Sequence, residues 1–403
     1  MPIFVNRRDA LTGILAAFAA AGIPRVSLAR AATEKRCVFV VLRGGMDGLT
    51  ALPPIGDPRY AILRGRFAIG ADGTAEAALP LDSTFGLHPA LSPFQPLWQA
   101  GELQAFHAFA SPYRGRSHFD AQKVLESGGI APSDSASGWL NRLAQAMGNA
   151  GTSMAVGFSV PLVLSGSARV ATWYPGPNLP EAPGLFEKLE ILYQNDAALH
   201  SALAIAGDTS RLLDDENDGA TMQAPAPTGA KTDTLVQAFA GLGALMKEDD
   251  GPRLATIDVL GWDTHSNQGA ATGRIAGRLA ELAAGLIALK AGLGSHWSST
   301  VVLAASEFGR TAQINGTSGT DHGTGSAGFA LGGALAGAKV HANWPGLTDN
   351  KLLDGRDLAP TGDWRRVFAT VAAAHFGIGG DILASKVFPQ AGDLRPLDGF
   401  IAA

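Results

Sequence analysis

The sequence lacks the features that define several protein classes. It contains a single cysteine, Cys37, which excludes a disulfide-rich secreted scaffold because no disulfide can form within the chain. Its formal net charge is −5, which gives no indication of a nucleic-acid partner. Hydrophobic residues make up 46% of its 403 positions, so the chain is not disordered and can bury a large core. Packing, with or without a bound metal, must therefore stabilise the fold.

The first 31 residues have the features of an export signal. Arg7 and Arg8 precede an apolar run at 11–23, and Ala29 and Ala31 form the small-x-small pattern of a cleavage site after Ala31. The apolar run is too short for a comfortable membrane span, so we expect no stable span after cleavage. The paired arginines predict export by the twin-arginine route, with a periplasmic or secreted mature protein. An ordinary Sec signal is the alternative.

Short apolar runs, each bounded by Gly, Ser or Asp, predict the strands of a buried sheet. Helical patterns lie among them, at 121–126, 273–293 and 364–376. Strands that alternate with helices imply a mostly parallel sheet sandwiched by helices, which is an α/β fold. We expect residues 32–403 to form a single domain of this class. The predicted strands are 37–42, 103–110, 154–163, 254–260, 300–305 and 328–331.

The segment at 207–232 differs from its surroundings. It is rich in Asp, Ala, Pro, Gly and Thr and has no hydrophobic periodicity. Such a composition predicts a loop or an inserted lid. A linker between two lobes is the alternative that the residues leave open.

Candidate functional residues follow the predicted strands. In an open α/β sheet, ligands bind outside the carboxyl ends of the strands. Carboxylates and neutral imidazoles on separate loops are the donors that a divalent ion such as zinc, manganese or magnesium takes. The sequence therefore predicts a metal site at this edge of the sheet. The residues concerned are Asp47, Ser117, His118, Asp263, His265, Glu307, Asp321 and His322.

Six sequence blocks belong together rather than singly. They are Leu42-Arg-Gly-Gly-Met-Asp-Gly48, Arg116-Ser-His-Phe-Asp-Ala-Gln122, Gly261-Trp-Asp-Thr-His265, Ser306-Glu-Phe-Gly-Arg-Thr311, Gly319-Thr-Asp-His-Gly323 and Gly355-Arg-Asp357. Together they resemble the bacterial family called domain of unknown function 1501. That family is grouped with the alkaline phosphatase and sulfatase superfamily, and the resemblance spans nearly the whole chain after the predicted signal.

The resemblance implies an alkaline-phosphatase-like fold with a divalent metal centre, which would hold zinc, manganese, magnesium or calcium. It makes Ser117 the nucleophile at the start of a helix. The sequence departs from the alkaline phosphatase pattern at Phe308, which stands where a His would follow the carboxylate, so the second metal is in question. The metal ligands that the resemblance implies are Asp263, His265 and His322 for one ion, Asp47 and Glu307 for a second, and Asp321 beside His322.

Such a site would support the hydrolysis of phosphate or sulfate esters. A bound dication lowers the pKa of a serine hydroxyl and neutralises the oxygens of the ester. Arg116 and Arg310 could clamp a tetrahedral anion with bidentate hydrogen bonds, and a helix that starts at Ser117 would add backbone N–H groups. The prediction is an exported metal-dependent hydrolase with a small-molecule or polymer ester as substrate.

The candidates also have structural explanations that the residues leave open. Asp47 would stabilise its Gly-rich turn, and Ser117 would be only the N-cap of its helix. Asp263 and His265 would hydrogen-bond to each other.

Similar explanations apply to the other candidates. Glu307 would form a salt bridge with Arg310, and Asp321 and His322 would belong to a flexible Gly-rich loop. For His118 we favour a packed core imidazole over a ligand. The remaining histidines have no companion ligands nearby in the sequence and are interpreted as structural or exposed, namely His88, His107, His200, His296, His341 and His375.

Two other functions remain open at this point. The chain would be a non-catalytic secreted or envelope binding protein that retains the fold and one metal and works with an envelope protein partner. Alternatively, it would transfer a phospho group on an envelope polymer at the same site.

Overall fold

The computed structural model describes residues 33–70, 73–74, 76–134, 136–148, 153–175, 232–389, 391–392 and 394–402. The predicted export signal and residues 207–231 of the predicted lid lie outside these ranges. The last residue of that predicted lid, Thr232, begins helix α9.

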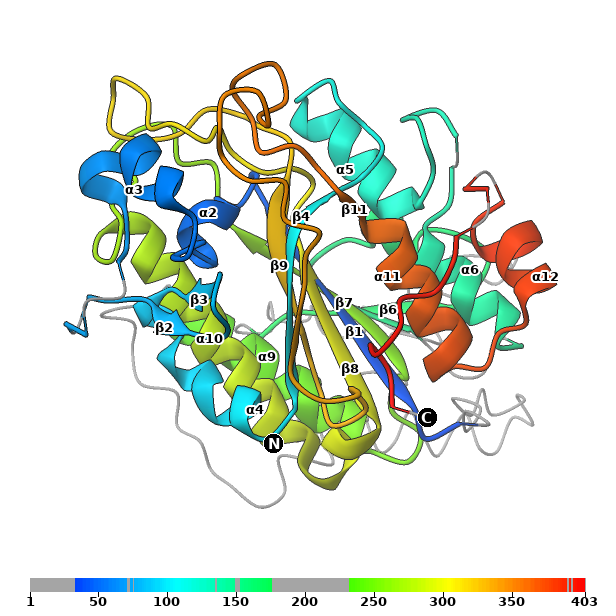
Figure 1. The fold of residues 1–403 in the computed structure, drawn as a ribbon. Coiled ribbons are helices and arrows are strands. Elements are labelled where there is room, and N and C mark those ends of the chain that lie inside the picture. Colours follow the sequence, from blue (N-terminus) through cyan, green and yellow to red (C-terminus); the bar gives the residue numbers. More distant parts are fainter. Residues whose placement is uncertain are drawn as a thin grey trace, which may run out of the picture.

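A nine-stranded sheet forms the centre of the described residues (Figure 1). Its order is β10-β4-β9-β8-β1-β7-β5-β6, and β11 also pairs with β4. All pairings are parallel except those of β9, which runs antiparallel to β4 and β8. The strands are β1 (Arg36–Arg43), β4 (Leu103–Ala110), β5 (Ser153–Val156), β6 (Val170–Trp173), β7 (Leu254–Leu260), β8 (Thr300–Ala305), β9 (Ser326–Leu331), β10 (Lys339–His341) and β11 (Gly362–Asp363). A separate hairpin joins β2 (Leu79–Pro80) and β3 (Gly86–Leu87).

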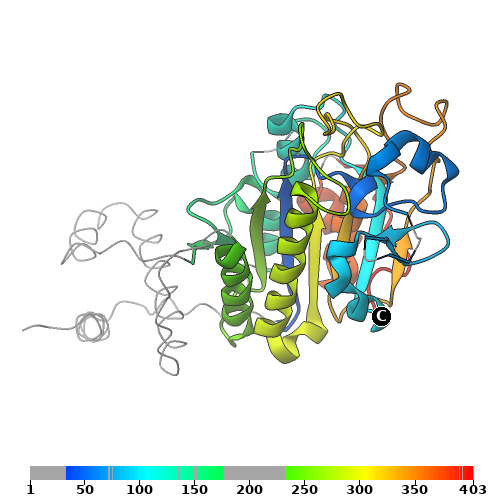
Figure 2. The same cartoon turned by 90° about the vertical axis from the view of Figure 1, so that its left-hand side faces the viewer.

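Helices cover both faces of the sheet, which confirms the predicted α/β class. On one face lie α9 (Thr232–Lys247) and α10 (Arg274–Leu293), which pack side by side in Figure 2. On the other lie α6 (Trp139–Ala146) and α11 (Trp364–Thr370). The other helices are α2 (Gly48–Ala51), α3 (Pro58–Arg64), α4 (Gln95–Gln99), α5 (His118–Ser127) and α12 (Gly380–Ile382).

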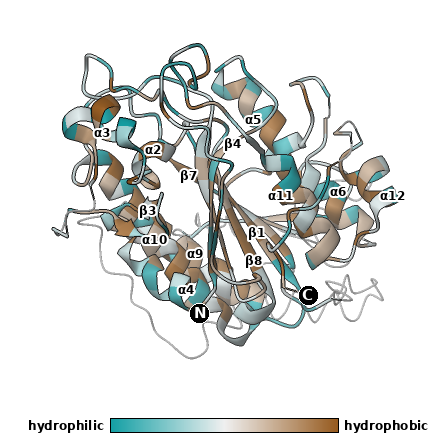
Figure 3. Ribbon diagram, in the orientation of Figure 1, coloured by the Kyte–Doolittle hydropathy of each residue, from teal (hydrophilic) through white to brown (hydrophobic). Residues whose placement is uncertain are grey.

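The central strand β1 shows why the sheet needs two covering layers. Its side chains alternate between the faces, as in any strand. Val38 and Val40 join the core beneath α9 and α10, whereas Phe39 packs edge-on against Trp139 and Phe368 on the other face. Every residue from Arg36 to Leu42 is fully buried, and hydrophobic residues line the central strands in Figure 3.

Most predicted strands occur where the apolar runs indicate them. The predictions for 103–110, 254–260 and 300–305 coincide with β4, β7 and β8. The prediction for 154–163 is wrong beyond Val156. The strand ends there because Gly157 turns the backbone and Pro161 has no N–H to give to a ladder. The predicted helix at 364–376 is α11 followed by a π-helical turn, Val371–His375.

The strand directions bring separate loops to one edge of the sheet. Parallel pairing places the carboxyl ends of β1, β7 and β8 side by side. Because β9 is antiparallel to β8, its amino end lies at that same edge, and the preceding loop at 319–325 joins the others. Among the described residues, no helix is both long enough and apolar enough to cross a membrane.

Candidate metal centre

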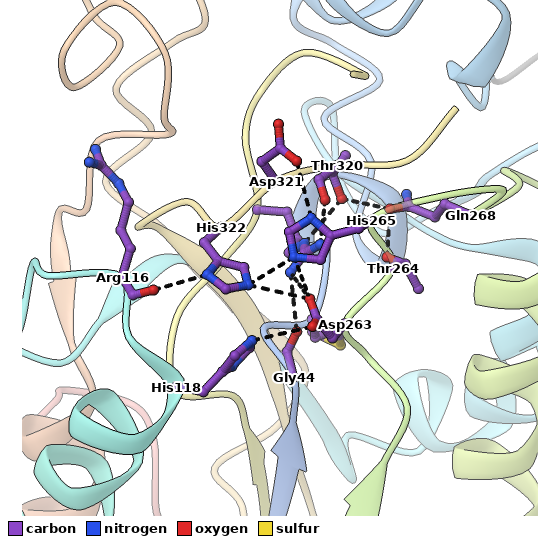
Figure 4. Close-up of polar contacts among 12 residues, drawn as sticks. Gly44, Arg116, His118, Asp263, Thr264, His265, Gln268, Thr320, Asp321 and His322 are labelled. Carbon is purple, nitrogen blue, oxygen red and sulfur yellow. Dashed lines mark hydrogen bonds and ion pairs between the residues drawn. The ribbon is translucent and has the colours of Figure 1, made fainter. Parts of the chain in front are cut away.

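Three imidazoles surround the carboxylate of Asp263 at this edge of the sheet (Figure 4). The Nε2 atom of His265 lies 3.0 Å from Asp263 Oδ1, and that of His322 lies 3.4 Å from the same oxygen. The Nε2 atom of His118 lies 3.6 Å from Oδ2. One ligand atom from each of His118, Asp263 and His322 falls within 4.8 Å of the other two. We call His118, Asp263, His265 and His322 the Asp263 cluster.

The other ring nitrogen of each histidine is held by an oxygen. His118 Nδ1 lies 2.7 Å from Glu307 Oε1, and His265 Nδ1 lies 3.1 Å from Asp321 Oδ1. His322 Nδ1 lies 2.9 Å from the carbonyl oxygen of Arg116. Carbonyl and ionised carboxylate oxygens only accept hydrogen bonds. In its neutral form each histidine therefore carries its hydrogen on Nδ1, as this network assigns it, and turns an Nε2 lone pair toward Asp263.

These donors fit a divalent cation. His118 Nε2 is buried and has no hydrogen-bond partner among the described residues, and the Nε2 atoms of His265 and His322 lie only 3.0 Å apart. Two lone pairs at that separation need a proton or a cation between them. Ligand histidines in metalloproteins typically donate Nδ1–H to a carboxylate or carbonyl, as all three do here.

The protonation states of the cluster also suit a cation. Burial alone would raise the pKa of the Asp263 carboxyl, but the hydrogen bond and charge of Arg310 outweigh it and lower that pKa. Burial lowers the pKa of His322, which keeps its imidazole neutral. The hydrogen bond to Glu307 raises the pKa of His118, so a cation would compete with a proton for that ring.

Arg310 is buried beneath the cluster. Its guanidinium donates to Asp263 Oδ1 at 2.7 Å and to the hydroxyl and carbonyl oxygens of Thr320. The side chain has no exposed surface. Arg310 therefore holds the Asp263 carboxylate in place, and the clamp on a substrate anion that we predicted for it would require this side chain to move.

Asp47 forms an ion pair with an arginine side chain. Its oxygens lie 2.6 and 2.7 Å from the two terminal nitrogens of Arg64, which α3 supplies. Thr50 and Gln268 each donate to Oδ2 at 2.7 Å. Both charged side chains are almost fully buried. Arg64 already neutralises this carboxylate, so the structure places Asp47 in an internal ion pair and not among the donor atoms around Asp263.

Two further predicted ligands hold histidines in this arrangement. Glu307 is buried and bonds to His118 and to the Gly44 N–H. Burial would raise the pKa of its carboxyl, but these hydrogen bonds lower it. Asp321 orients His265 and accepts a hydrogen bond from Asn315 at 3.0 Å. Each of these carboxylates contacts the Nδ1 atom of one histidine of the cluster, on the side of the ring opposite the converging Nε2 atoms.

Ser117 is the N-cap residue of α5 and directly precedes His118. Its carbonyl oxygen accepts the Ala121 N–H, but its hydroxyl makes no capping hydrogen bond within the described part of the chain. The nucleophilic role of Ser117 stays a prediction. The guanidinium of Arg116 points away from the histidines in Figure 4 and pairs with Asp354 and Asp357.

His118 is a candidate metal ligand in this structure, whereas the sequence favours a packed core imidazole. The signal was present, because His118 follows Ser117 within the block at 116–122. The aromatic ring of Phe308 lies 4.8 Å from the His118 ring and 5.1 Å from the His322 ring, centroid to centroid. A side chain at Gly45 would collide with Phe308, so this glycine makes room for the ring that supports the two histidines.

The fold and the cluster together define an α/β protein with a candidate His/Asp metal centre at the carboxyl edge of a mostly parallel sheet. The chain belongs to the family described as "Protein of unknown function (DUF1501)", which matches residues 100–387. No curated protein sequence matches the chain.

Several solved structures are similar to this chain. The lipoteichoic acid synthase LtaP from Listeria monocytogenes has a TM-score of 0.42 at 11% identity, and the match covers 94% of this chain and 81% of that one. The PsFucS1 sulfatase from Pseudoalteromonas sp. has a TM-score of 0.38 at 11% identity, with 94% and 73% covered. The C-terminal periplasmic domain of EcEptC from Escherichia coli, in complex with Zn, has a TM-score of 0.34 at 10% identity, with 93% and 94% covered.

Proposed function

We propose that this protein is an exported hydrolase of phosphate or sulfate esters that uses one divalent ion bound by the Asp263 cluster. The observation that carries the proposal is the convergence of three Nε2 atoms on an ionised carboxylate, with every Nδ1 held by an oxygen. Imidazole-rich donor sets favour zinc over manganese, magnesium or calcium.

The surrounding residues support ester chemistry at this position. When bound, the ion would supply positive charge that stabilises the oxygens of a tetrahedral anion and lowers the pKa of a nearby hydroxyl. Ser117 lies next to His118 in the chain, at the amino end of α5. Backbone N–H groups at a helix start attract anions. We assign Ser117 the attack on phosphorus or sulfur: its hydroxyl loses the proton, the ester oxygen leaves with that proton as an alcohol, and water then releases phosphate or sulfate from the serine. Arg310 orients Asp263.

A single ion distinguishes this proposal from a two-metal site. The bidentate contact with Arg64 occupies Asp47, and Phe308 replaces an imidazole beside Glu307. The loss of these donors for a second ion also favours a second candidate function, a secreted or envelope binding protein that retains the fold and one metal without turnover. A transferase that acts on an envelope polymer would use the same site with another acceptor.

Metal analysis combined with an ester panel tests the proposal. Purified protein is expected to hold one ion per chain and to release phosphate or sulfate from chromogenic esters. Asp263→Ala should lower the metal content, whereas Ser117→Ala should abolish turnover with metal and fold retained. His296→Ala, which removes an imidazole outside the cluster, serves as the control. One ion without turnover on any ester would support the binding protein, and absence of bound metal would refute the proposed centre.

Export is part of the proposal and rests on Arg7 and Arg8. The double substitution Arg7→Lys and Arg8→Lys should retain the protein in the cytoplasm, because twin-arginine export depends on both guanidinium groups. Cell fractionation measures the outcome. Unchanged export of the double variant would support the Sec alternative.

A further inference from the structure

The backbone of Arg116 adopts a conformation that side chains disfavour. Its φ angle is 58°, in the left-handed region, where the Cβ of an L-residue approaches the backbone too closely. This conformation has a visible consequence, because the carbonyl oxygen of Arg116 accepts the Nδ1 hydrogen of His322 at 2.9 Å (Figure 4). A disfavoured backbone angle persists only where its surroundings hold it.

The ion pairs of the Arg116 side chain hold its backbone in this conformation. Its Nε and terminal nitrogen lie 2.9 and 2.8 Å from Asp357 Oδ2, and the terminal nitrogen also bonds to Asp354 at 3.0 Å. Asp357 is fully buried and accepts a further hydrogen bond from Thr324 at 2.8 Å. A buried carboxylate with paired donors makes a rigid anchor, because breaking the pair leaves a desolvated charge.

The turn at 355–357, which contains Asp357, also contacts the loop at 319–325, which contains His322. Arg356, next to Asp357, donates to the backbone oxygen of His322 at 2.7 Å. The backbone of Ala312 bonds to the Arg356 oxygen at 3.0 Å. The block at 355–357 therefore contacts both Arg116 and His322, which are hydrogen-bonded to each other. This role differs from that of a metal ligand or a catalytic residue.

We propose that Arg116 and Asp357 are positioning residues for the metal centre. Asp357 holds the Arg116 side chain and, with it, the backbone that turns the Arg116 carbonyl toward His322 Nδ1. That hydrogen bond leaves the His322 Nε2 lone pair directed at the ion. The inference rests on the proposed metal centre, and it gives Arg116 a role different from the substrate clamp that the sequence predicted.

A pair of substitutions separates the backbone conformation from the guanidinium. Arg116→Ala and Arg116→Gly both remove the guanidinium, but only alanine has a Cβ that disfavours a φ of 58°. We expect Arg116→Ala to weaken zinc binding by about tenfold or more, within the range for residues that orient metal ligands. Arg116→Gly should recover most of that loss. Asp357→Asn should weaken binding about as much as Arg116→Ala.

Zinc affinity is measured by competition with a chromogenic chelator, and thermal unfolding of the metal-free proteins checks the fold. The absorption spectrum of the Co²⁺-loaded proteins provides a second readout, since it changes when a ligand histidine is reoriented but not when the fold is merely less stable. Arg59→Ala, which removes a surface arginine that pairs with Asp349, is the control and should change neither readout.

The outcomes distinguish this inference from the proposed function. If wild-type protein binds zinc and Arg116→Ala binds it equally well, the positioning role is wrong and the metal centre stands. If Arg116→Gly and Arg116→Ala bind zinc equally weakly, the backbone conformation of residue 116 does not determine zinc affinity, and the inference fails. If wild-type protein binds no zinc, Co²⁺ or Mn²⁺, the metal centre itself fails.

Discussion

Two aspartates that follow neighbouring parallel strands have opposite surroundings. Asp263, after β7, has a side chain that is 43% exposed and faces three imidazoles, and the Arg310 guanidinium contacts only its Oδ1, at 2.7 Å. Asp47, after β1, is 1% exposed and faces a guanidinium at 2.6 and 2.7 Å. A buried carboxylate requires a permanent partner because desolvation penalises its charge. A half-exposed carboxylate that contacts a guanidinium through one oxygen can accept an exchangeable cation beside the imidazoles.

This comparison explains why residue type and strand position did not suffice to identify ligands. Asp47 and Asp263 both lie a few residues beyond the carboxyl ends of adjacent parallel strands, at the same edge of the sheet. The difference arises from α3, which brings Arg64 to Asp47. The four predictions below test whether the two regions behave as separate centres, one for stability and one for metal binding.

The largest expected effect is on stability. Arg64→Met should lower the free energy of unfolding by about 3–5 kcal/mol, because it leaves Asp47 as an unpaired buried charge. Urea denaturation measures this loss. The double variant Asp47→Asn with Arg64→Met should regain part of it, and zinc affinity of the folded protein should remain unchanged. A loss of bound zinc in the double variant would place Asp47 in the metal centre after all.

His118→Ala should reduce zinc affinity by at least about a hundredfold, the upper limit for residues that only orient a ligand. The reason is that His118 presents a buried Nε2 toward Asp263, and the residues that the structure describes give this atom no hydrogen-bond partner. Isothermal titration of the metal-free protein measures the change, with His296→Ala as the matched control. Equal affinities for wild-type and His118→Ala protein would support the interpretation of His118 as a core residue.

Glu307→Gln should weaken zinc binding by about tenfold, since the amide oxygen still accepts the His118 Nδ1 hydrogen but without the carboxylate charge. The same titration gives the value. A loss as large as that of His118→Ala would mean that Glu307 contacts the ion directly, as the sequence analysis predicted.

The smallest expected effect is on acid stability. The charge and hydrogen bonds of Arg64 outweigh burial and lower the pKa of Asp47. A lowered carboxyl pKa stabilises the fold above about pH 3.9, the usual value in an unfolded chain, and this stabilisation is lost as the pH falls through the native pKa. Below about pH 4, the unfolding free energy of wild-type protein should decline faster than that of the Asp47→Asn, Arg64→Met double variant, by at most about 1.4 kcal/mol per pH unit. Urea denaturation at a series of pH values provides the comparison, and parallel curves would contradict the pKa assignment.

Much of the sheet could be predicted because strand formation has a local cause. The apolar runs that became β4 and β8 bury every side chain, and the run that became β7 buries all but Asp258 and Leu260, so their composition alone marks their bounds. The prediction failed after Val156, where composition stayed apolar but Gly157 and Pro161 ended the strand.

The sequence by itself determined the α/β class, the central strands and the chemical types of the residues at their carboxyl ends. Only the tertiary structure decided that β9 runs antiparallel, which brings His322 beside Asp263, and that Arg64 neutralises Asp47. The physical reason is range: burial patterns are set by neighbours along the chain, whereas the partner of a charge is set by contacts between segments that lie far apart in the chain.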